Sequence, residues 1–137
     1  MSFSVYINYK GKCREAMNFY SQVFGGDAPR ITTFGDMPAS PDFPLDDATK
    51  PLVAHAEFRV GDATIMGSDV PDGMPYTKGN NITIMVQSKS KEDLARWYEA
   101  IKSGGDVEMA LGPQSWSPLY AFVHDRYGIG WHFNLLE

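Results

Sequence analysis

Residues 13–26, CREAMNFYSQVFGG, have the pattern of an amphipathic helix. Apolar residues recur there at three- and four-residue spacings, which places them on one face of a helix. Polar residues fall on the opposite face, and the two glycines at the end can adopt the left-handed conformation that stops a helix. We therefore expect a helix with one buried face, formed by Ala16, Phe19, Tyr20, Val23 and Phe24.

A second copy of this design lies at residues 90–105, SKEDLARWYEAIKSGG. Aligning Tyr20 with Tyr98 places apolar positions over apolar positions and a glycine over a glycine at the helix end. Ser90 is the expected N-cap of this helix. One repeat of this size indicates a duplicated module, because a solenoid needs three or more units.

Strands are predicted around both helices. Residues 3–9 alternate between apolar and polar side chains, which is typical of a half-buried strand. Each half therefore has the order strand, helix, three strands, and one helix per half cannot cover a sheet alone, so we expect the halves to combine into one larger curved sheet. Similar patterns predict strands at 30–34, 52–60, 63–68, 81–87, 106–111, 119–124 and 130–136.

The predicted organisation is a single α+β domain over residues 1–137. Module one covers about 1–70, a linker rich in proline and glycine covers 71–80, and module two covers about 81–137. Residues 35–51 contain four prolines and four aspartates without periodicity. Such a segment is long for a structureless connection, so we expect a mobile lid or a segment at a dimer edge.

Composition narrows the classes of partner. The chain has 137 residues and a net charge of −5, which argues against nucleic acid or an anionic membrane as the main partner. No apolar run is long enough to span a membrane, and the first residues lack a signal-peptide pattern. The single cysteine, Cys13, excludes an internal disulfide and suits a reducing compartment. We expect a cytoplasmic protein.

Several spaced motifs together resemble the PhnB-like family of the vicinal oxygen chelate superfamily, which includes glyoxalases, bleomycin-resistance proteins and dioxygenases. The resemblance covers nearly the whole chain and implies two βαβββ modules that form an eight-stranded open barrel around a ligand cavity, usually in a homodimer. Some members are labelled ubiquinone-pathway methyltransferases, but this sequence lacks a glycine-rich turn of the SAM-binding kind. The motifs are KGKCREAMNFYSQVFGG, GDMP, AHAEFRVGDATIMGSD, KSGGDVEMALGPQSW and VHDRYGIGW.

The resemblance also implies a divalent metal, held by His, Gln or Glu side chains from the first, fourth, fifth and eighth strands, that acts as a Lewis acid. The corresponding positions here fall near Ser4, Asp69 and Asn81, and at His132 after the turn at 125–128. Zinc and similar ions need three or four protein ligands. We therefore expect the metal site of the superfamily to be lost and no cofactor to be bound.

The alternating strands also suggest which side chains line the cavity. His55 and Glu57 are two apart on one strand, so they share a face, opposite to Ala56 and Phe58. This pair is either hydrogen-bonded or a displaced metal site, and His132 is either an interior histidine or a ligand. Trp116, in a loop with glycine and proline, is expected as a pocket wall. The predicted cavity residues are Tyr6, Asn8, His55, Glu57, Thr83, Met85, Trp116 and His132.

Three functions stay open at this point, and no catalytic residue is identified. The first is a metal-free protein that binds or sequesters a small molecule in a partly apolar cavity. The second is a divalent-metal-dependent lyase, isomerase or dioxygenase with non-standard ligands. The third is a dimeric scaffold without ligand. Cys13 is expected to be a small buried or half-exposed thiol rather than a reactive one with a lowered pKa.

Overall fold

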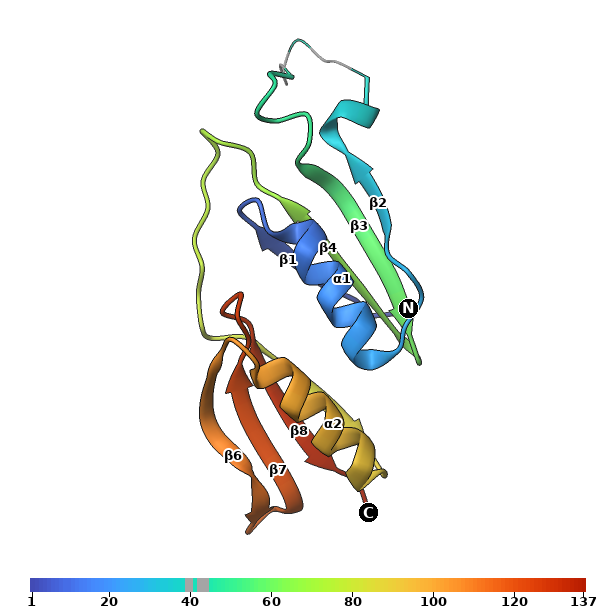
Figure 1. The fold of residues 1–137 in the computed structure, drawn as a ribbon, viewed down its shortest axis with the longest axis vertical. Helices are drawn as coiled ribbons and strands as arrows, with labels where there is room; N and C mark the ends of the chain where they lie inside the picture. The colour runs from blue at the N-terminus through green and yellow to red at the C-terminus, as the bar shows by residue number, and fades with distance from the viewer. Residues whose placement is uncertain (39–40, 42–44) are drawn as a thin grey trace. The chain divides into compact units, whose positions relative to one another are not determined.

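The chain forms two compact units, Met1–Tyr76 and Thr77–Glu137. The computed structural model describes residues 1–38, 41 and 45–137 (Figure 1). Each unit is a module with its own sheet and its own helix. Within the described residues, no helix is long and apolar enough to cross a membrane.

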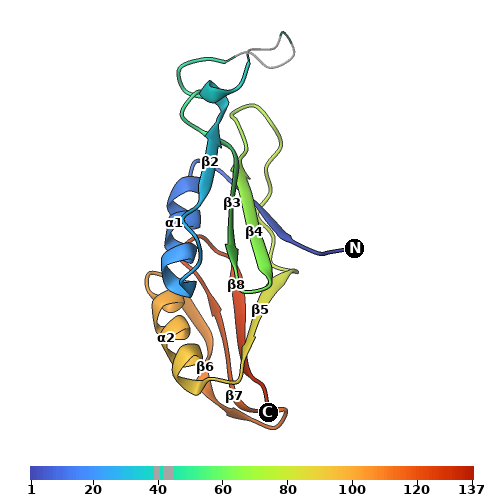
Figure 2. The same ribbon diagram turned by 90° about the vertical axis from the view of Figure 1, so that its right-hand side faces the viewer.

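The first module is a mixed four-stranded sheet with a helix on one face. The strand order is β1-β4-β3-β2, with β1 parallel to β4 and the other neighbours antiparallel. Figure 2 shows α1 on one side of this sheet, where it packs against β3 and β4. The elements are β1 (Val5–Tyr9), α1 (Cys13–Phe24), β2 (Arg30–Thr33), a short 3-10 helix η1 (Phe34–Asp36), β3 (Val53–Val60) and β4 (Ala63–Asp69).

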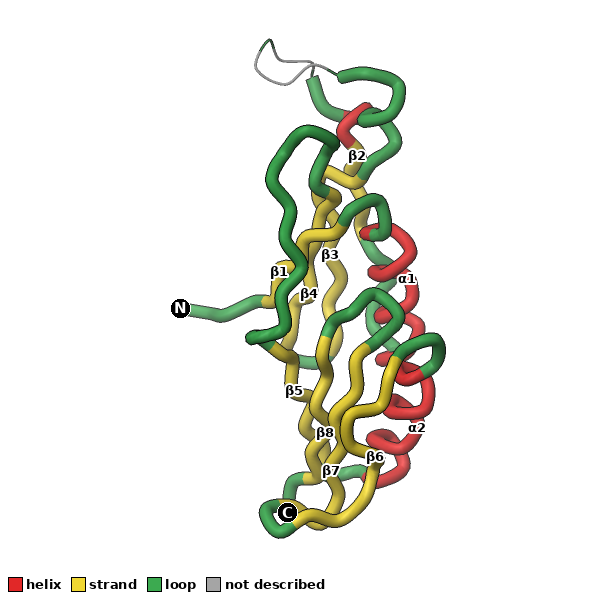
Figure 3. Tube along the Cα trace, turned by 90° about the vertical axis from the view of Figure 1, so that its left-hand side faces the viewer, coloured by secondary structure: helices red, strands yellow, loops and turns green. Residues whose placement is uncertain are grey.

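The second module repeats this plan. Its strand order is β5-β8-β7-β6, and β5 is parallel to β8 while the other neighbours are antiparallel. Helix α2 packs on one face of the sheet, as the tube in Figure 3 shows. The elements are β5 (Thr83–Ser88), α2 (Lys91–Lys102), β6 (Asp106–Gln114), β7 (Ser117–His124) and β8 (Gly130–Leu135).

The α+β class and the strand-helix-three-strand order of both modules are confirmed. The eight-stranded open barrel is not supported, because the hydrogen bonds among the described strands form two separate four-stranded sheets. The sequence argument was wrong here because it assumed that a sheet covered by only one helix must join the other sheet. One helix covers one face of each sheet and leaves the other face for different side chains.

The core of the first module follows the periodicity of α1. Ala16, Met17 and Tyr20 are fully buried, while the left-handed Gly25 ends the helix, as predicted. Gly67 on β4 lies directly beneath α1. A Cβ atom there would come 2.5 Å from the Met17 side chain and 2.8 Å from the Ile7 carbonyl oxygen, so only glycine allows this close approach.

The second module has an equivalent core under α2. Ser90 caps the helix by accepting a hydrogen bond from the Asp93 backbone N–H at 3.1 Å, as predicted. Tyr98 contacts Phe133 edge-to-face at a centroid distance of 6.4 Å. The fully buried residues include Leu94, Ile101, Ala121, Val123 and Phe133.

In each module a buried carboxylate accepts hydrogen bonds that hold neighbouring segments together. In the first, Asp69 accepts hydrogen bonds from the backbone N–H groups of Cys13 at 3.0 Å and Val53 at 2.9 Å. This ties the end of β4 to the start of α1 and of β3. In the second, Asp125 stabilises the turn between β7 and β8. It accepts from two backbone N–H groups in the turn, those of residues 127 and 129, and from the Trp131 indole.

Some predicted strand ends are wrong. Phe3 is 93% exposed and precedes β1, and Ile82 is 82% exposed and precedes β5. The alternation of apolar and polar residues begins before the first backbone pairing, so the predicted strands start two residues too early. The opposite error occurs at β6, which was expected to end at 111 but continues through Gly112 to Gln114 with irregular register, so that Trp116 lies in the hairpin turn between β6 and β7.

Both ends of the segment 35–51 are held by hydrogen bonds. Thr33 and Asp36 form a reciprocal capping box, and the Gly35 N–H donates to the Lys50 carbonyl at 2.9 Å. The prediction of a lid or dimer-edge segment falls partly on residues 39–40 and 42–44, which lie outside the described residues, and it stays a prediction.

Candidate ligand-binding faces

Each sheet carries its helix on one face and predicted site residues on the other. We call the helix-free face of the first sheet the polar face, and it presents Tyr6, Asn8, His55 and Glu57. The helix-free face of the second sheet is the aromatic face. It presents Thr83, Met85 and His132, with Trp116 at the adjoining hairpin. That all eight residues line one cavity stays a prediction.

On the polar face, ionisable side chains from three strands form a continuous row. The Tyr6 hydroxyl lies 3.4 Å from His55 Nδ1, and His55 Nε2 lies 3.3 Å from Glu57 Oε1. The other carboxylate oxygen of Glu57 pairs with Arg30 at 3.4 Å. The strands set this row, because Glu57 pairs with Arg30 on β2 and with Met66 on β4, which pairs in turn with Tyr6.

A shorter polar contact lies beside this row. The Ser68 hydroxyl donates to the Asn8 side-chain carbonyl at 3.3 Å. These residues are direct neighbours in the parallel pairing of β1 and β4. The His55–Glu57 pair itself is hydrogen-bonded, which is one of the two interpretations of the sequence; that the pair holds no metal stays a prediction.

On the aromatic face, four rings contact one another in sequence. The imidazole of His132 stacks on Phe122 at a centroid distance of 4.1 Å and an interplanar angle of 6°. His132 Nδ1 is hydrogen-bonded to the Tyr120 hydroxyl at 2.6 Å. Trp116 meets the Tyr120 ring edge-on at 5.4 Å. We call Trp116, Tyr120, Phe122 and His132 the aromatic ladder.

The ladder is open to solvent at Trp116, and the neighbour of His132 on the next strand is exposed as well. The Trp116 residue is 60% exposed, and Met85, the direct strand neighbour of His132, is 49% exposed. Thr83 lies beside Gly130, where an added Cβ atom would come 2.7 Å from the Thr83 methyl group and 3.2 Å from the Phe122 ring. The glycine therefore lets Phe122 lie flat next to the strand.

Burial keeps the polar pair of the ladder uncharged. It lowers the pKa of His132, with a further lowering from the nearby His124, and it raises the pKa of Tyr120. Near pH 7 a neutral imidazole therefore meets a neutral phenol. This surface can stack on a planar group and can exchange one hydrogen bond, without imposing a charge on it.

Sequence reasoning missed two members of the ladder as site residues. Tyr120 and Phe122 are two apart on β7 and therefore face the same side as His124. That spacing was the available signal. Trp131 lies on the opposite face of β8 from His132, where it is 1% exposed and hydrogen-bonded to Asp125. Arg30 and Ser68 were missed because cross-strand register is not visible in sequence.

The residues do not fit the divalent metal that the resemblance implies. Asp69 uses both carboxylate oxygens on backbone N–H groups, and His132 Nδ1 is engaged with Tyr120. Ser4 and Asn81 are exposed and precede their strands. In the part of the chain that the structure describes, no three His, Cys, Asp or Glu side chains are grouped so that they could hold a metal.

Cys13 is not a reactive thiol. It is fully buried at the start of α1. Burial, with a smaller contribution from the Asp69 carboxylate, raises its pKa to about 12. The interpretation of Cys13 as a small buried thiol is confirmed.

Comparison with known proteins gives consistent matches along the chain. The profile of the Glyoxalase/Bleomycin resistance protein/Dioxygenase superfamily matches residues 8–133. Protein YjdN of Escherichia coli (strain K12) is 27% identical over 144 residues, covering 100% of this chain and 97% of that protein.

Solved structures also match nearly the full length. The crystal structure of protein PA1353 from Pseudomonas aeruginosa has a TM-score of 0.88 and 31% identity, over 98% of this chain and 97% of that chain. The PhnB protein from Bacillus cereus has a TM-score of 0.77 and 23% identity, over 99% of this chain and 100% of that chain. The second match is a likeness of fold.

Proposed function

Because the chain belongs to the glyoxalase/bleomycin resistance protein/dioxygenase superfamily, we propose that it is a small-molecule binding or sequestering protein that works without a metal. The aromatic face is its binding surface. The ligand is an organic molecule with a planar, uncharged ring system and one polar substituent. The sequestering role follows from binding alone and needs no catalytic group.

The observation that carries this proposal is the aromatic ladder. A well-packed aromatic ring is ordinarily buried, yet the ladder ends in Trp116, which is 60% exposed. Exposed aromatic rings that are held by neighbouring rings provide contact area with little loss of side-chain entropy. Each added ring contact contributes about 0.5–1.5 kcal/mol beyond the area buried.

The polar pair gives the surface some selectivity. His132 and Tyr120 are joined by a hydrogen bond of 2.6 Å, and their shifted pKa values keep both groups neutral near pH 7. A ligand with a hydroxyl or carbonyl group can share this bond.

A metal-dependent lyase, isomerase or dioxygenase is not favoured by any donor set in the described residues. We derive no reaction step that uses a metal. Self-association into a homodimer remains part of the proposal, and the molar mass in solution, measured by light scattering, tests it: a mass near 31 kDa, twice the 15.3 kDa of the chain, is expected.

The experiment is a fluorescence and thermal-shift titration with two planar probes, indole and naphthol, on chelator-treated protein. We expect saturable binding and a rise in melting temperature, because a ligand that binds only the folded state stabilises it. Trp116→Leu is expected to weaken binding about tenfold, which corresponds to about 1.4 kcal/mol.

The matched control is Trp97→Phe, which removes a tryptophan from the helix of the same module. It is expected to leave the affinity within about twofold of the original value. Equal losses in both variants, or no saturation with either probe, would contradict the proposal.

A further inference from the structure

A hollow lies at the edge of the first sheet, between β3 and the segment that leads into β2. The Asp27 N–H donates to the Arg59 carbonyl at 3.0 Å, while Arg30 pairs with Glu57. Residues 27 and 30, which are three apart, therefore lie opposite residues 59 and 57 of β3, which are only two apart. The longer segment bows outward, as in a β-bulge.

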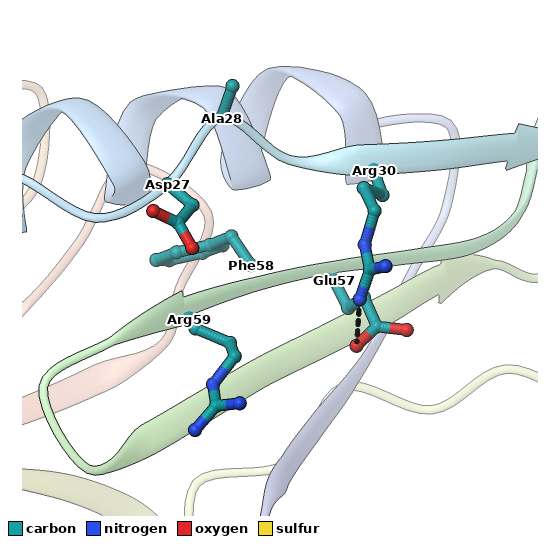
Figure 4. A pocket seen from close by; sticks show the side chains of 6 residues that line it. All are labelled: Asp27, Ala28, Arg30, Glu57, Phe58 and Arg59. Carbon is teal, nitrogen blue, oxygen red and sulfur yellow. Dashed lines mark ion pairs between the residues drawn. The ribbon is translucent and has the colours of Figure 1, made fainter.

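This bow creates a hollow of about 330 Å³. Figure 4 shows the six residues that line it. The backbone fixes the geometry: a Cβ atom at Gly26 would come 2.7 Å from the Arg59 carbonyl oxygen, so this glycine allows the chain to cross close to β3. The lining residues are Asp27, Ala28, Arg30, Glu57, Phe58 and Arg59.

Two guanidinium groups border the hollow and differ in their partners. Arg30 pairs with Glu57 at 3.4 Å, and its side chain is 80% exposed. Arg59 is also exposed, and within the described ranges it forms no ion pair with a carboxylate. In Figure 4 the Arg59 side chain extends away from the Arg30–Glu57 pair, and no dashed line joins it to that pair.

The charge of Glu57 is already matched by Arg30, and His55 contacts its other oxygen at 3.3 Å. Among the described residues Arg59 therefore has no carboxylate partner, in a chain whose net charge is −5. Exposed ion pairs are worth little, so Arg30 can turn from Glu57 toward a second anion at small cost. The Asp27 carboxylate lines the same hollow and opposes the binding of an anion there, so the two guanidinium groups must outweigh it.

We propose that this hollow binds a small oxyanion, a carboxylate or a phosphate group, through the guanidinium groups of Arg59 and Arg30. The planar fork of arginine matches the oxygens of both groups in a bidentate way, which lysine cannot reproduce. Arg59 supplies the principal contact, and Arg30 is shared between Glu57 and the ligand. The inference concerns the first module and does not depend on the proposed function of the aromatic face.

The test is a titration of the full chain, at low ionic strength, with inorganic phosphate and separately with acetate, followed by backbone amide NMR shifts. We expect saturable shifts at residues 26–30 and 57–59 with at least one probe. Arg59→Gln should weaken the affinity about tenfold or more, and Arg30→Gln should weaken it several-fold. Response to phosphate alone or to acetate alone supports the site and identifies the preferred oxyanion.

Two further variants make the result specific. Glu57→Gln should tighten binding several-fold, because it releases Arg30 and removes a competing negative charge. Arg14→Gln removes the same charge from the exposed side of α1 in the same module and should leave the affinity within about twofold. Absence of saturable shifts with both probes, or an equal loss in the Arg14 and Arg59 variants, would overturn the proposal.

Discussion

The two modules share one strand order, but their helix-free faces have different chemistry. The polar face carries a row of ionisable groups from Tyr6 to Arg30, whereas the aromatic face carries stacked rings around His132. The core under each helix is apolar in both cases. The two modules thus share apolar buried positions that stabilise the fold, while the alternate strand positions differ in chemistry between them.

The two helices also differ in their first residues. Helix α1 begins with the buried Cys13, and α2 begins with the exposed Lys91 after a serine cap. The largest expected effect therefore concerns the reactivity of Cys13, the single thiol of the chain. With a pKa of about 12, only about one Cys13 thiol in ten thousand is ionised at pH 8.

We expect native protein to react with iodoacetamide at least about a thousandfold more slowly than urea-unfolded protein at the same pH. The burial of Cys13 and its raised pKa both act in this direction. The measurement is the labelled mass after timed quenching, with the unfolded chain as the control. Complete labelling of native protein within minutes would mean that α1 opens far more readily than its packing indicates.

The second prediction compares the two buried carboxylates. Asp125 accepts three hydrogen bonds and Asp69 accepts two from backbone N–H groups. Removing such an acceptor leaves buried donors unsatisfied, at about 1–3 kcal/mol for each group. We expect Asp125→Ala to lower the free energy of unfolding by about 3 kcal/mol or more, and Asp69→Ala by somewhat less.

Urea unfolding followed by circular dichroism measures both changes. Asp106→Ala, at an exposed position at the start of β6, is the control and should change the free energy of unfolding by less than about 0.5 kcal/mol. If Asp125→Ala were as mild as this control, the turn between β7 and β8 would not depend on its carboxylate.

The third prediction concerns the pH dependence of the second module. Burial lowers the pKa of His132 below its usual 6.5 in the folded state, so the unfolded chain takes up a proton first as the pH falls. The contribution of neutral His132 to the free energy of unfolding is therefore complete above about pH 6.5, and it is lost as the pH falls through the lowered pKa of the folded state. His132→Gln should therefore reduce the loss of stability between pH 7.5 and pH 5.

His124→Gln is the matched variant, because it removes the second cause of the lowered pKa and leaves His132 in place. It should reduce the same loss only in part. Free energies of unfolding at the two pH values give the comparison. A steeper pH dependence in the His132 variant than in the original protein would show that the sign of the shift is wrong.

The smallest expected effect is on the exposed side of α2. Arg96 pairs with Asp93 at 2.8 Å, three residues away on the helix. Pairs of this kind contribute about 0.5 kcal/mol or less and weaken with salt. Arg96→Gln should shift the free energy of unfolding by no more than that, and the shift should disappear in high salt. A larger, salt-independent loss would indicate that the Arg96 stem packs on the helix.

The sequence predicted the helices well because their periodicity and caps are local signals. Residues 13–24 and the Ser90 cap are examples. It predicted the sidedness of His55, Glu57 and His132 because strand alternation is also local. It could not give Arg30 as the partner of Glu57, because that contact depends on the register between two strands, including the outward bow at residues 27–30.

The barrel was expected from the family resemblance and from the argument that one helix cannot cover a sheet. Neither of these tells which strands are hydrogen-bonded to each other, and the described strands form two separate sheets. The ladder was found only in part. The alternation of Tyr120, Phe122 and His124 was present in the sequence, but the stacking of Phe122 on His132 required the antiparallel pairing of β7 and β8.

The most direct test of the central claim is an amide NMR titration of chelator-treated protein with naphthol. The account predicts saturable shifts at Met85, Trp116, Tyr120, Phe122 and His132, with an affinity unchanged when zinc or manganese is added back. Binding that appears only after the metal is restored, or saturable shifts confined to other residues, would contradict a metal-free aromatic binding face.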